Sequence, residues 1–228
     1  MKVVILAGGR GLRLSEFTDA IPKPMIDVGG KPIIEHIMQI YADQGQTDFI
    51  ILGGYKIRVI SDWLNDADLP WQVELLDTGV DTMTGGRIAK AARHLGDRFH
   101  LTYGDGLANV ELPSLTAYHE HYGGYCTVTA VHPLPRFGEL ELSGAHVTRW
   151  SEKKNGSGWI SGGFYVCQPD ILDYIYGDEP FESGACTRMV KAGVLTAFRH
   201  EGYWQCCDTL KDVATLRDHW KEVGAWTG

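Results

Sequence analysis

The sequence of 228 residues predicts an α/β fold: a doubly wound, mostly parallel, Rossmann-like sheet with helices on both faces. A continuous apolar run at residues 3–7 is typical of a strand that is buried on both faces, and the segment 48–54 reads as a second buried strand. Segments with helical spacing alternate with strands to about residue 123. Strand-like segments dominate residues 124–228, which we expect to form a β-rich elaboration on the same sheet. We therefore predict one domain over 1–228, whose first half (1–123) binds a ligand and whose second half (124–228) adds a second subsite and a C-terminal helix.

The elements of the first half follow from periodicity and turn signals. A strand at 3–7 precedes a glycine-rich loop, and apolar residues after Pro32 fall at helical spacing until a helix end near Gly45. We further expect strands at 48–54 and 71–79 with a helix at 56–64 between them. A Gly-Gly turn then leads into a helix at 84–96, and a strand at 99–107 ends in a Gly-Asp-Gly loop.

In the second half, four segments read as strands separated by turns: 125–133, 138–144, 145–153 and 159–167. Two segments look helical, at 168–177 and 186–193. The chain then returns to extended structure at 195–209, and a final helix begins at about Leu210.

Composition narrows the function classes. The apolar fraction of 44% indicates a globular protein, and the net charge of −8 argues against non-specific nucleic-acid binding. The sequence contains no apolar run approaching a membrane span of about 18 residues. Its five cysteines match no disulfide framework or zinc spacing, so we expect reduced thiols and a cytoplasmic location.

The glycine-rich loop "LAGGRGLRL" suggests an anion site. Glycines leave backbone N–H groups exposed, and Arg10 and Arg13 can contact phosphate oxygens. The spacing is neither a Walker loop nor G-x-G-x-x-G, so a plain strand-to-helix turn stays open. In "PKPM" two prolines stiffen the loop around Lys23, which could neutralise a phosphate or simply face solvent.

A resemblance extends these motifs. Taken with six further motifs, these two motifs make the sequence resemble the sugar-1-phosphate nucleotidyltransferases, particularly the glucose-1-phosphate cytidylyltransferases. The further motifs follow in the family's order to about Trp220: "GGKPIIEH", "DTGVDTMTGGRI", "TYGDG", "RFGEL", "WISGGFYV" and "VKAGVLTAFRHEGYWQCCDTLKD". The resemblance implies transfer of CMP from CTP to a phosphorylated acceptor with release of pyrophosphate. A phosphate of the acceptor is then the nucleophile, so the nine histidines need no catalytic role.

The resemblance also implies the site residues. Catalysis falls to Arg13, Lys23 and Lys153, and a magnesium cofactor to Asp105 and Asp208. Nucleotide binding is implied for Leu6, Ala7, Gly8, Gly9, Gly11, Arg13, Lys23, Thr84, Gly85, Gly86, Arg87 and Asp105. Acceptor binding is implied for Gly138, Glu152, Lys153, Ser161 and Gly162. Neither nucleic acid nor membrane is an expected partner, and a homo-oligomer is expected.

The sequence departs from the family pattern at four places, of which the first affects the nucleotide side and the others bear on the acceptor. Leu12 stands where the family has threonine, and Ser161 where it has the asparagine that contacts the sugar. The stretch 181–188 is altered, and the connection 65–74 is short where glucose-specific enzymes carry a longer segment that helps bind nucleotide across subunits. We therefore expect an acceptor other than glucose 1-phosphate. The alternatives are a glucose-1-phosphate cytidylyltransferase that makes CDP-glucose, and a thymidylyl- or uridylyltransferase of the same fold.

Two readings from other classes fit less well. A binding module that had lost catalysis would also lose Lys23 or the two metal aspartates, and all three residues are present. An NAD(P)-dependent Rossmann enzyme needs an acidic residue at the end of the second strand, where this sequence has "GGYK".

Overall fold

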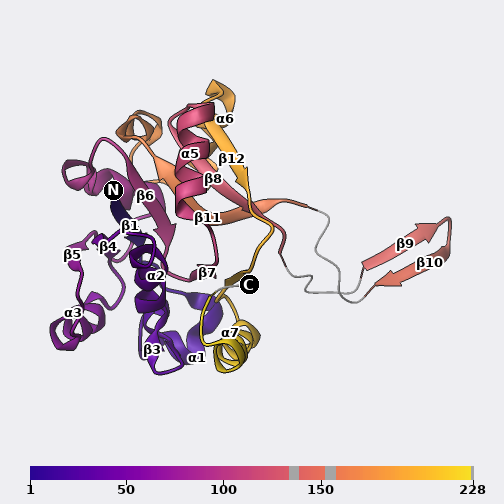
Figure 1. The fold of residues 1–228 in the computed structure, drawn as a ribbon, viewed down its shortest axis with the longest axis horizontal. Helices are drawn as coiled ribbons and strands as arrows, with labels where there is room; N and C mark the ends of the chain where they lie inside the picture. The colour runs from indigo at the N-terminus through magenta and orange to yellow at the C-terminus, as the bar shows by residue number, and fades with distance from the viewer. Residues whose placement is uncertain (134–138, 152–157, 227–228) are drawn as a thin grey trace.

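A computed structural model of the chain describes residues 1–133, 139–151 and 158–226. Its centre is a seven-stranded sheet in the order β12-β8-β11-β6-β1-β4-β5 (Figure 1). Strand β11 runs antiparallel to both of its neighbours, and all other adjacent strands are parallel. The strands span β1 Lys2–Leu6, β4 Asp48–Gly53, β5 Gln72–Asp77, β6 Phe99–Tyr103, β8 Cys126–Val131, β11 Ile160–Cys167 and β12 Leu195–Arg199. The predicted doubly wound, mostly parallel α/β fold is confirmed.

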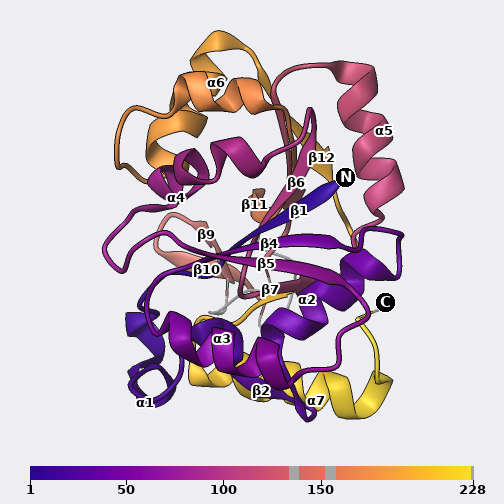
Figure 2. The same cartoon turned by 90° about the vertical axis from the view of Figure 1, so that its left-hand side faces the viewer.

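Helices cover both faces of this sheet (Figure 2). Alternate residues of β1 point to opposite faces, as a strand's period of two requires. Val3 and Ile5 pack with α2, α3, α5 and α7, whereas Val4 and Leu6 pack with α4 and α6. The helices span α1 Ser15–Thr18, α2 Ile33–Ala42, α3 Ile57–Asp66, α4 Thr84–Lys90, α5 Leu112–Tyr122, α6 Thr187–Ala192 and α7 Leu210–Val223.

Three short antiparallel pairs lie outside the central sheet. They are β2 Asp27–Val28 with β3 Lys31–Pro32, β7 Gly106–Ala108 with β13 Trp204–Cys206, and β9 Glu139–Ser143 with β10 His146–Ser151. The β9–β10 hairpin lies apart from the central sheet (Figure 1). The pair β7–β13 matters most for function, because it joins segments that lie about a hundred residues apart in sequence.

Two local predictions need correction. Gly85 and Gly86 do not form a turn before a helix, since both lie in the first turn of α4. The expected helix at 168–177 is a 3-10 helix over Pro169–Tyr174. A π-helix over Glu182–Cys186 follows, in the stretch that departs from the family pattern. Within the described ranges, every helix is too short or too polar to cross a membrane.

Candidate active site

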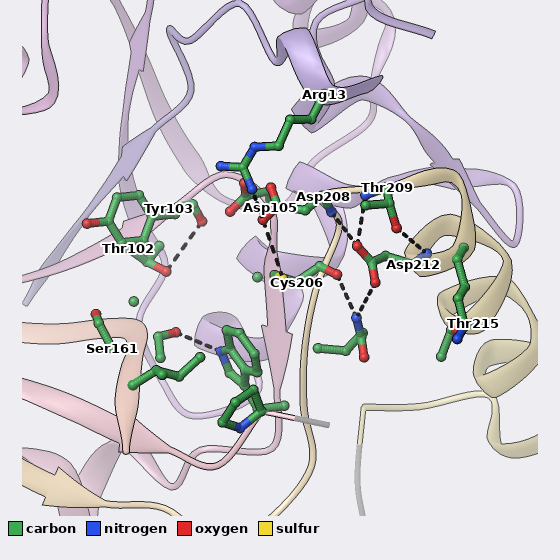
Figure 3. A pocket seen from close by; sticks show the side chains of 18 of the residues that line it. Arg13, Thr102, Tyr103, Asp105, Ser161, Cys206, Asp208, Thr209, Asp212 and Thr215 are labelled. Carbon is green, nitrogen blue, oxygen red and sulfur yellow. Dashed lines mark hydrogen bonds and ion pairs between the residues drawn. The ribbon is translucent and has the colours of Figure 1, made fainter. Parts of the chain in front are cut away.

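A cavity of about 1170 Å³ opens beside the carboxyl end of β6 (Figure 3). It brings together residues from the glycine-rich loop, β6, β11, the π-helix, β13 and the start of α7. The lining residues are Arg13, Thr102, Tyr103, Asp105, Gly106, Pro133, Ile160, Ser161, Gly162, Gly163, Glu182, Trp204, Gln205, Cys206, Asp208, Thr209, Lys211, Asp212 and Thr215. Arg13, Asp105, Asp208, Ser161 and Gly162 are thus predicted site residues that share one cavity.

The charged centre of this site is Lys23. Its Nζ donates to Asp105 Oδ2 and to Asp208 Oδ1, each at 2.6 Å, and its side chain is only 13% exposed. Arg13 Nη1 reaches the second oxygen of Asp208 at 2.8 Å (Figure 3). Burial alone would lower the pKa of Lys23, but the two carboxylates outweigh it and raise that pKa above its ordinary value. Among the described residues, two cations thus face two carboxylates here.

The loop that carries Lys23 is held by close packing. Pro22 and Pro24 bracket the residue, which opens a 3-10 turn over Lys23–Met25. The Gly-Asp-Gly loop after β6 comes so close that a Cβ at Gly104 would lie 2.9 Å from Pro24 Cγ. Gly11 has a φ of +62°, and a Cβ there would meet Lys23 Cβ at 3.3 Å. The two glycines let three loops converge on Lys23.

Asp208 reaches the site through the β7–β13 pair. Cys206 lies opposite Gly106 in this pair, and the Cys207 N–H donates to Asp105 O at 2.9 Å. Immediately after Asp208, α7 begins with a capping box in which Thr209 Oγ1 accepts from Asp212 N while the Asp212 carboxylate accepts from Thr209 N. The sheet pair and the helix cap together fix Asp208 beside Asp105.

The glycine-rich loop lies next to the cavity, and Arg13 is the loop residue that lines it. Gly9 is exposed, and a Cβ there would meet nothing within 4 Å. The Arg10 side chain forms a surface ion pair with Asp81, with 2.8 Å between Nη2 and Oδ1. After Gly11 come a 3-10 turn over Leu12–Leu14 and the four-residue helix α1, so the loop has no long helix behind it. An anion at this loop could therefore bind the exposed backbone at Gly9 and the side chain of Arg13.

Arg87, a predicted nucleotide-binding residue, is buried and is not among the residues that line the cavity. The residue is 3% exposed, and its guanidinium donates to the Gly8, Gly53, Gly79 and Val80 carbonyls and to a threonine hydroxyl. A Cβ at Gly8 would lie 2.1 Å from Arg87 Nη1, so glycine is needed there for packing. Through its two terminal nitrogens Arg87 therefore ties the glycine-rich loop to β4 and to the loop after β5.

Gly85 and Gly86 likewise have a packing role in this structure. A Cβ at Gly85 would meet Glu179 O at 2.7 Å, and one at Gly86 would meet Asp178 Oδ1 at 2.1 Å. Thr84, which begins α4, donates to Glu182 Oε2 at 2.9 Å. The start of α4 is thus docked against the segment that precedes the π-helix.

On the acceptor side, Ser161 and Gly162 lie at a bulge in β11. Ser161 pairs with Ala130 of β8 and Tyr165 with Val128, so four residues of β11 lie opposite a step of only two residues on β8. Gly163 has a φ of +77°, and a Cβ there would lie 2.5 Å from the Tyr103 ring. Trp204 Nε1 donates to Gly162 O at 2.8 Å. Bulges re-aim side chains next to active sites, and this one places Ser161 on the cavity wall. The predicted acceptor residues Gly138, Glu152 and Lys153 lie outside the described residues.

Comparison with known proteins identifies the family. The sequence profile described as nucleotidyl transferase matches residues 2–228. The chain belongs to the nucleotidyl transferase family. It is 39% identical over 246 residues to a probable glucose-1-phosphate cytidylyltransferase of Bacillus subtilis, covering 97% of each chain. It is 40% identical over 248 residues to the glucose-1-phosphate cytidylyltransferase of Salmonella typhi, covering 97% of this chain and 96% of the relative. The predicted sugar-1-phosphate nucleotidyltransferase is confirmed.

The chain also has the fold of a solved structure. The crystal structure of HddC from Yersinia pseudotuberculosis superposes with a TM-score of 0.73 at 26% identity, covering 96% of this nucleotidyl transferase and 99% of the other chain. The likeness extends over both halves of the central sheet. The likeness in fold therefore covers nearly the whole of this nucleotidyl transferase.

Several residues of this nucleotidyl transferase's cavity were not predicted from sequence. Tyr103 and Glu182 line it, and the Tyr103 hydroxyl donates to Glu182 Oε1. Cys206 also lines it, and burial together with Asp208 and Asp105 raises the pKa of its thiol to about 11. The motifs "TYGDG" and "EPFESG" contain Tyr103 and Glu182, but their contact joins residues that are 79 positions apart.

Proposed function

We propose that this nucleotidyltransferase transfers CMP from CTP to glucose 1-phosphate and so makes CDP-glucose and pyrophosphate. The observation that carries the proposal is the 39–40% identity, over 97% of the chain, to two relatives named for this reaction. The departures at Ser161 and in 181–188 favour another acceptor, but the relatives give that expectation no support. The cavity volume of about 1170 Å³ leaves room for a nucleotide beside a phosphorylated acceptor.

The chemistry is a displacement at phosphorus. An acceptor phosphate oxygen forms a bond to the α-phosphorus of CTP, and the bond from that phosphorus to the bridging oxygen breaks, with pyrophosphate taking the electron pair. The nucleophile is already an anion, so no side chain has to remove a proton. Catalysis then rests on position and charge. Lys23 and Arg13 are cations beside the cavity, and we assign them to the phosphates of the nucleotide.

The carboxylates fit a magnesium ion. Asp105 and Asp208 turn oxygens toward one point, where the ammonium of Lys23 lies in this structure. Two carboxylates that converge from separate loops, with substrate phosphates and water completing the shell, are the donor set that Mg²⁺ takes in phosphoryl-transfer sites. When bound, the ion would neutralise charge on the phosphates. We therefore propose Asp105 and Asp208 as its ligands, with Lys23 and Arg13 assigned to the phosphates of the nucleotide beside them.

Several predicted roles remain proposals. Gly8, Gly9 and Gly11 would hold the triphosphate, with Leu6 and Ala7 leading into their loop. Gly138, Glu152 and Lys153 would hold the acceptor together with Ser161 and Gly162. We also propose a homo-oligomer, which light scattering of the purified chain would test.

The experiment that tests the function is a screen for pyrophosphate release. CTP, UTP and dTTP are each combined with glucose 1-phosphate, with other hexose 1-phosphates and with non-sugar phosphates or phosphonates. The proposal expects the highest kcat/KM for CTP with glucose 1-phosphate. A different acceptor, preferred by tenfold or more with CTP, would restore the prediction made from Ser161. Preference for another nucleotide would instead refute the cytidylyltransferase assignment.

A further inference from the structure

A series of hydrogen bonds links three residues of the cavity wall, Ser161, Tyr103 and Glu182, by way of the buried Tyr165. Thr84 Oγ1 donates to Glu182 Oε2 at 2.9 Å, and the Tyr103 hydroxyl donates to Glu182 Oε1. The Tyr103 and Tyr165 hydroxyl oxygens are 3.3 Å apart, and Tyr165 Oη lies 3.0 Å from Ser161 Oγ. We call the hydrogen-bonded series of Ser161, Tyr165, Tyr103 and Glu182 the hydroxyl relay. It connects the helix that begins with Thr84 to the acceptor side.

The proton inventory of the relay allows one direction only. A carboxylate can only accept hydrogen bonds, and each hydroxyl group has a single proton to donate. Tyr103 gives its proton to Glu182, so Tyr165 must donate to Tyr103. Ser161 must then donate to Tyr165. Ser161 therefore has no proton left for a substrate, while its oxygen keeps lone pairs on the cavity wall.

Burial raises the pKa of the Tyr165 hydroxyl, so the middle of the relay keeps its proton. The hydrogen bond that Tyr103 donates to Glu182 then sets the polarity of the whole relay. Glu182 is itself anchored by Thr84, whose hydroxyl also accepts from Phe181 N at 2.8 Å. Short π-helices like the one that begins at Glu182 frequently mark functional sites.

From this polarity we infer that Ser161 is a hydrogen-bond acceptor for one hydroxyl of the sugar phosphate, and that Tyr165, Tyr103 and Glu182 are positioning residues that set this specificity. The inference rests on the proposed function, because it assumes a hydroxylated phosphorylated acceptor. A substrate hydroxyl that donates to Ser161 is recognised. A group that can only accept, such as fluorine, meets the lone pairs of Ser161 and gains nothing. A site that is built for a hydroxyl rejects analogues that lack its proton.

The test compares glucose 1-phosphate with its deoxy and fluorodeoxy analogues, one ring hydroxyl at a time, with CTP saturating. At one ring position we expect the deoxy and the fluoro analogue both to lose tenfold or more in kcat/KM. In Tyr165→Phe the proton of Ser161 is released, so the fluoro analogue should recover at least threefold relative to the deoxy analogue. In Ser161→Ala the parent and the deoxy compound should become equal at that position.

One control variant and a second relay variant make the result decisive. Tyr125→Phe removes a tyrosine hydroxyl outside the relay and should leave every analogue ratio unchanged. Glu182→Gln can donate to Tyr103, so it should relax the same preference as Tyr165→Phe. Fluoro analogues that match glucose 1-phosphate at every position, or an unchanged ratio in Tyr165→Phe, would overturn the assignment of Ser161.

Failure of the proposed function gives a different result. If no pair of nucleotide and acceptor releases pyrophosphate, that function is wrong and the kcat/KM ratios of the analogues cannot be measured. Calorimetric titration of glucose 1-phosphate and the fluoro analogues onto the full chain then decides the inference without turnover. Weaker binding of one fluoro analogue, reversed in Tyr165→Phe, supports it. Equal binding of all of them, or no binding, overturns it.

Discussion

Lys23 and Arg87 are both withdrawn from solvent, but opposite kinds of partner hold them. Lys23 lies between the carboxylates of Asp105 and Asp208 at the edge of a large cavity. Arg87 is enclosed by backbone carbonyls and a threonine hydroxyl, and it keeps its charge because a guanidinium stays protonated although burial lowers its pKa. Carboxylates can exchange a lysine for other cations, whereas buried carbonyls bound by arginine have no alternative partner. The arrangement around Lys23 is therefore suited to binding charged ligands, whereas the arrangement around Arg87 stabilises the fold.

The largest effect should follow from breaking the carboxylate centre. Asp208→Asn keeps the shape of the side chain but removes a charge that faces Lys23 and Arg13. We expect kcat/KM to fall at least 10³-fold, about 4 kcal/mol of transition-state stabilisation, with the melting temperature close to wild type. Asp218→Asn, on the exposed side of α7 with a side chain 71% exposed, is the matched control. Near-normal turnover in Asp208→Asn would remove this residue from the site.

Arg87→Lys tests the opposite arrangement. A lysine ammonium cannot reach carbonyls on β4, the glycine-rich loop and the loop after β5 together, so buried acceptors lose their partners. We expect the free energy of unfolding to fall by about 3 kcal/mol, measured by urea denaturation. Arg93→Lys, at an exposed position, should change it little. A loss in Arg87→Lys no larger than in this control would contradict the structural role.

Two neighbouring glycines sharpen the comparison within one loop. An alanine at position 8 would place its Cβ 2.1 Å from Arg87 Nη1, whereas one at position 9 meets nothing within 4 Å. Gly8→Ala should therefore lower the free energy of unfolding by about 2 kcal/mol. Gly9→Ala should leave stability unchanged but raise KM for CTP, because its methyl group occupies the space assigned to phosphate. Equal melting temperatures for the two variants would show that Arg87 yields to the new methyl group.

His100 provides a third case, a buried group without a charged partner. It is fully buried in β6, and burial lowers its pKa to about 4. The unfolded chain therefore binds a proton below about pH 6.5 that the folded chain does not, so stability falls as pH falls. Between pH 7 and 5.5 the titration of His100 should lower the free energy of unfolding by about 1 kcal/mol. His100→Met should lose this part of the slope in urea unfolding, and the exposed-site variant His121→Gln should keep it.

Much of the fold was predictable because apolar periodicity is a local signal. The runs that became β1 and β4, and the helical spacing that became α2, were recognisable within a dozen residues. The convergence of Lys23, Asp105 and Asp208 was implied by family motifs. The role of Arg87 was not predictable, because its acceptor Gly8 lies 79 positions away and is a backbone atom without a sequence signature. The direction of the Ser161 hydrogen bond likewise depends on a residue that is distant in sequence. It is set by Glu182 through Tyr103 of β6 and Tyr165 of β11.

The central claim is that the cavity with Lys23, Asp105 and Asp208 transfers CMP to a sugar phosphate. The most direct measurement is a single-turnover reaction of excess enzyme with [α-³²P]CTP and glucose 1-phosphate, quenched and resolved by chromatography. We predict that the label appears in CDP-glucose with wild type and with Asp218→Asn, and at least 10³-fold more slowly with Asp208→Asn. Label that appears in free CMP, or that reaches CDP-glucose at the wild-type rate in Asp208→Asn, would contradict the account.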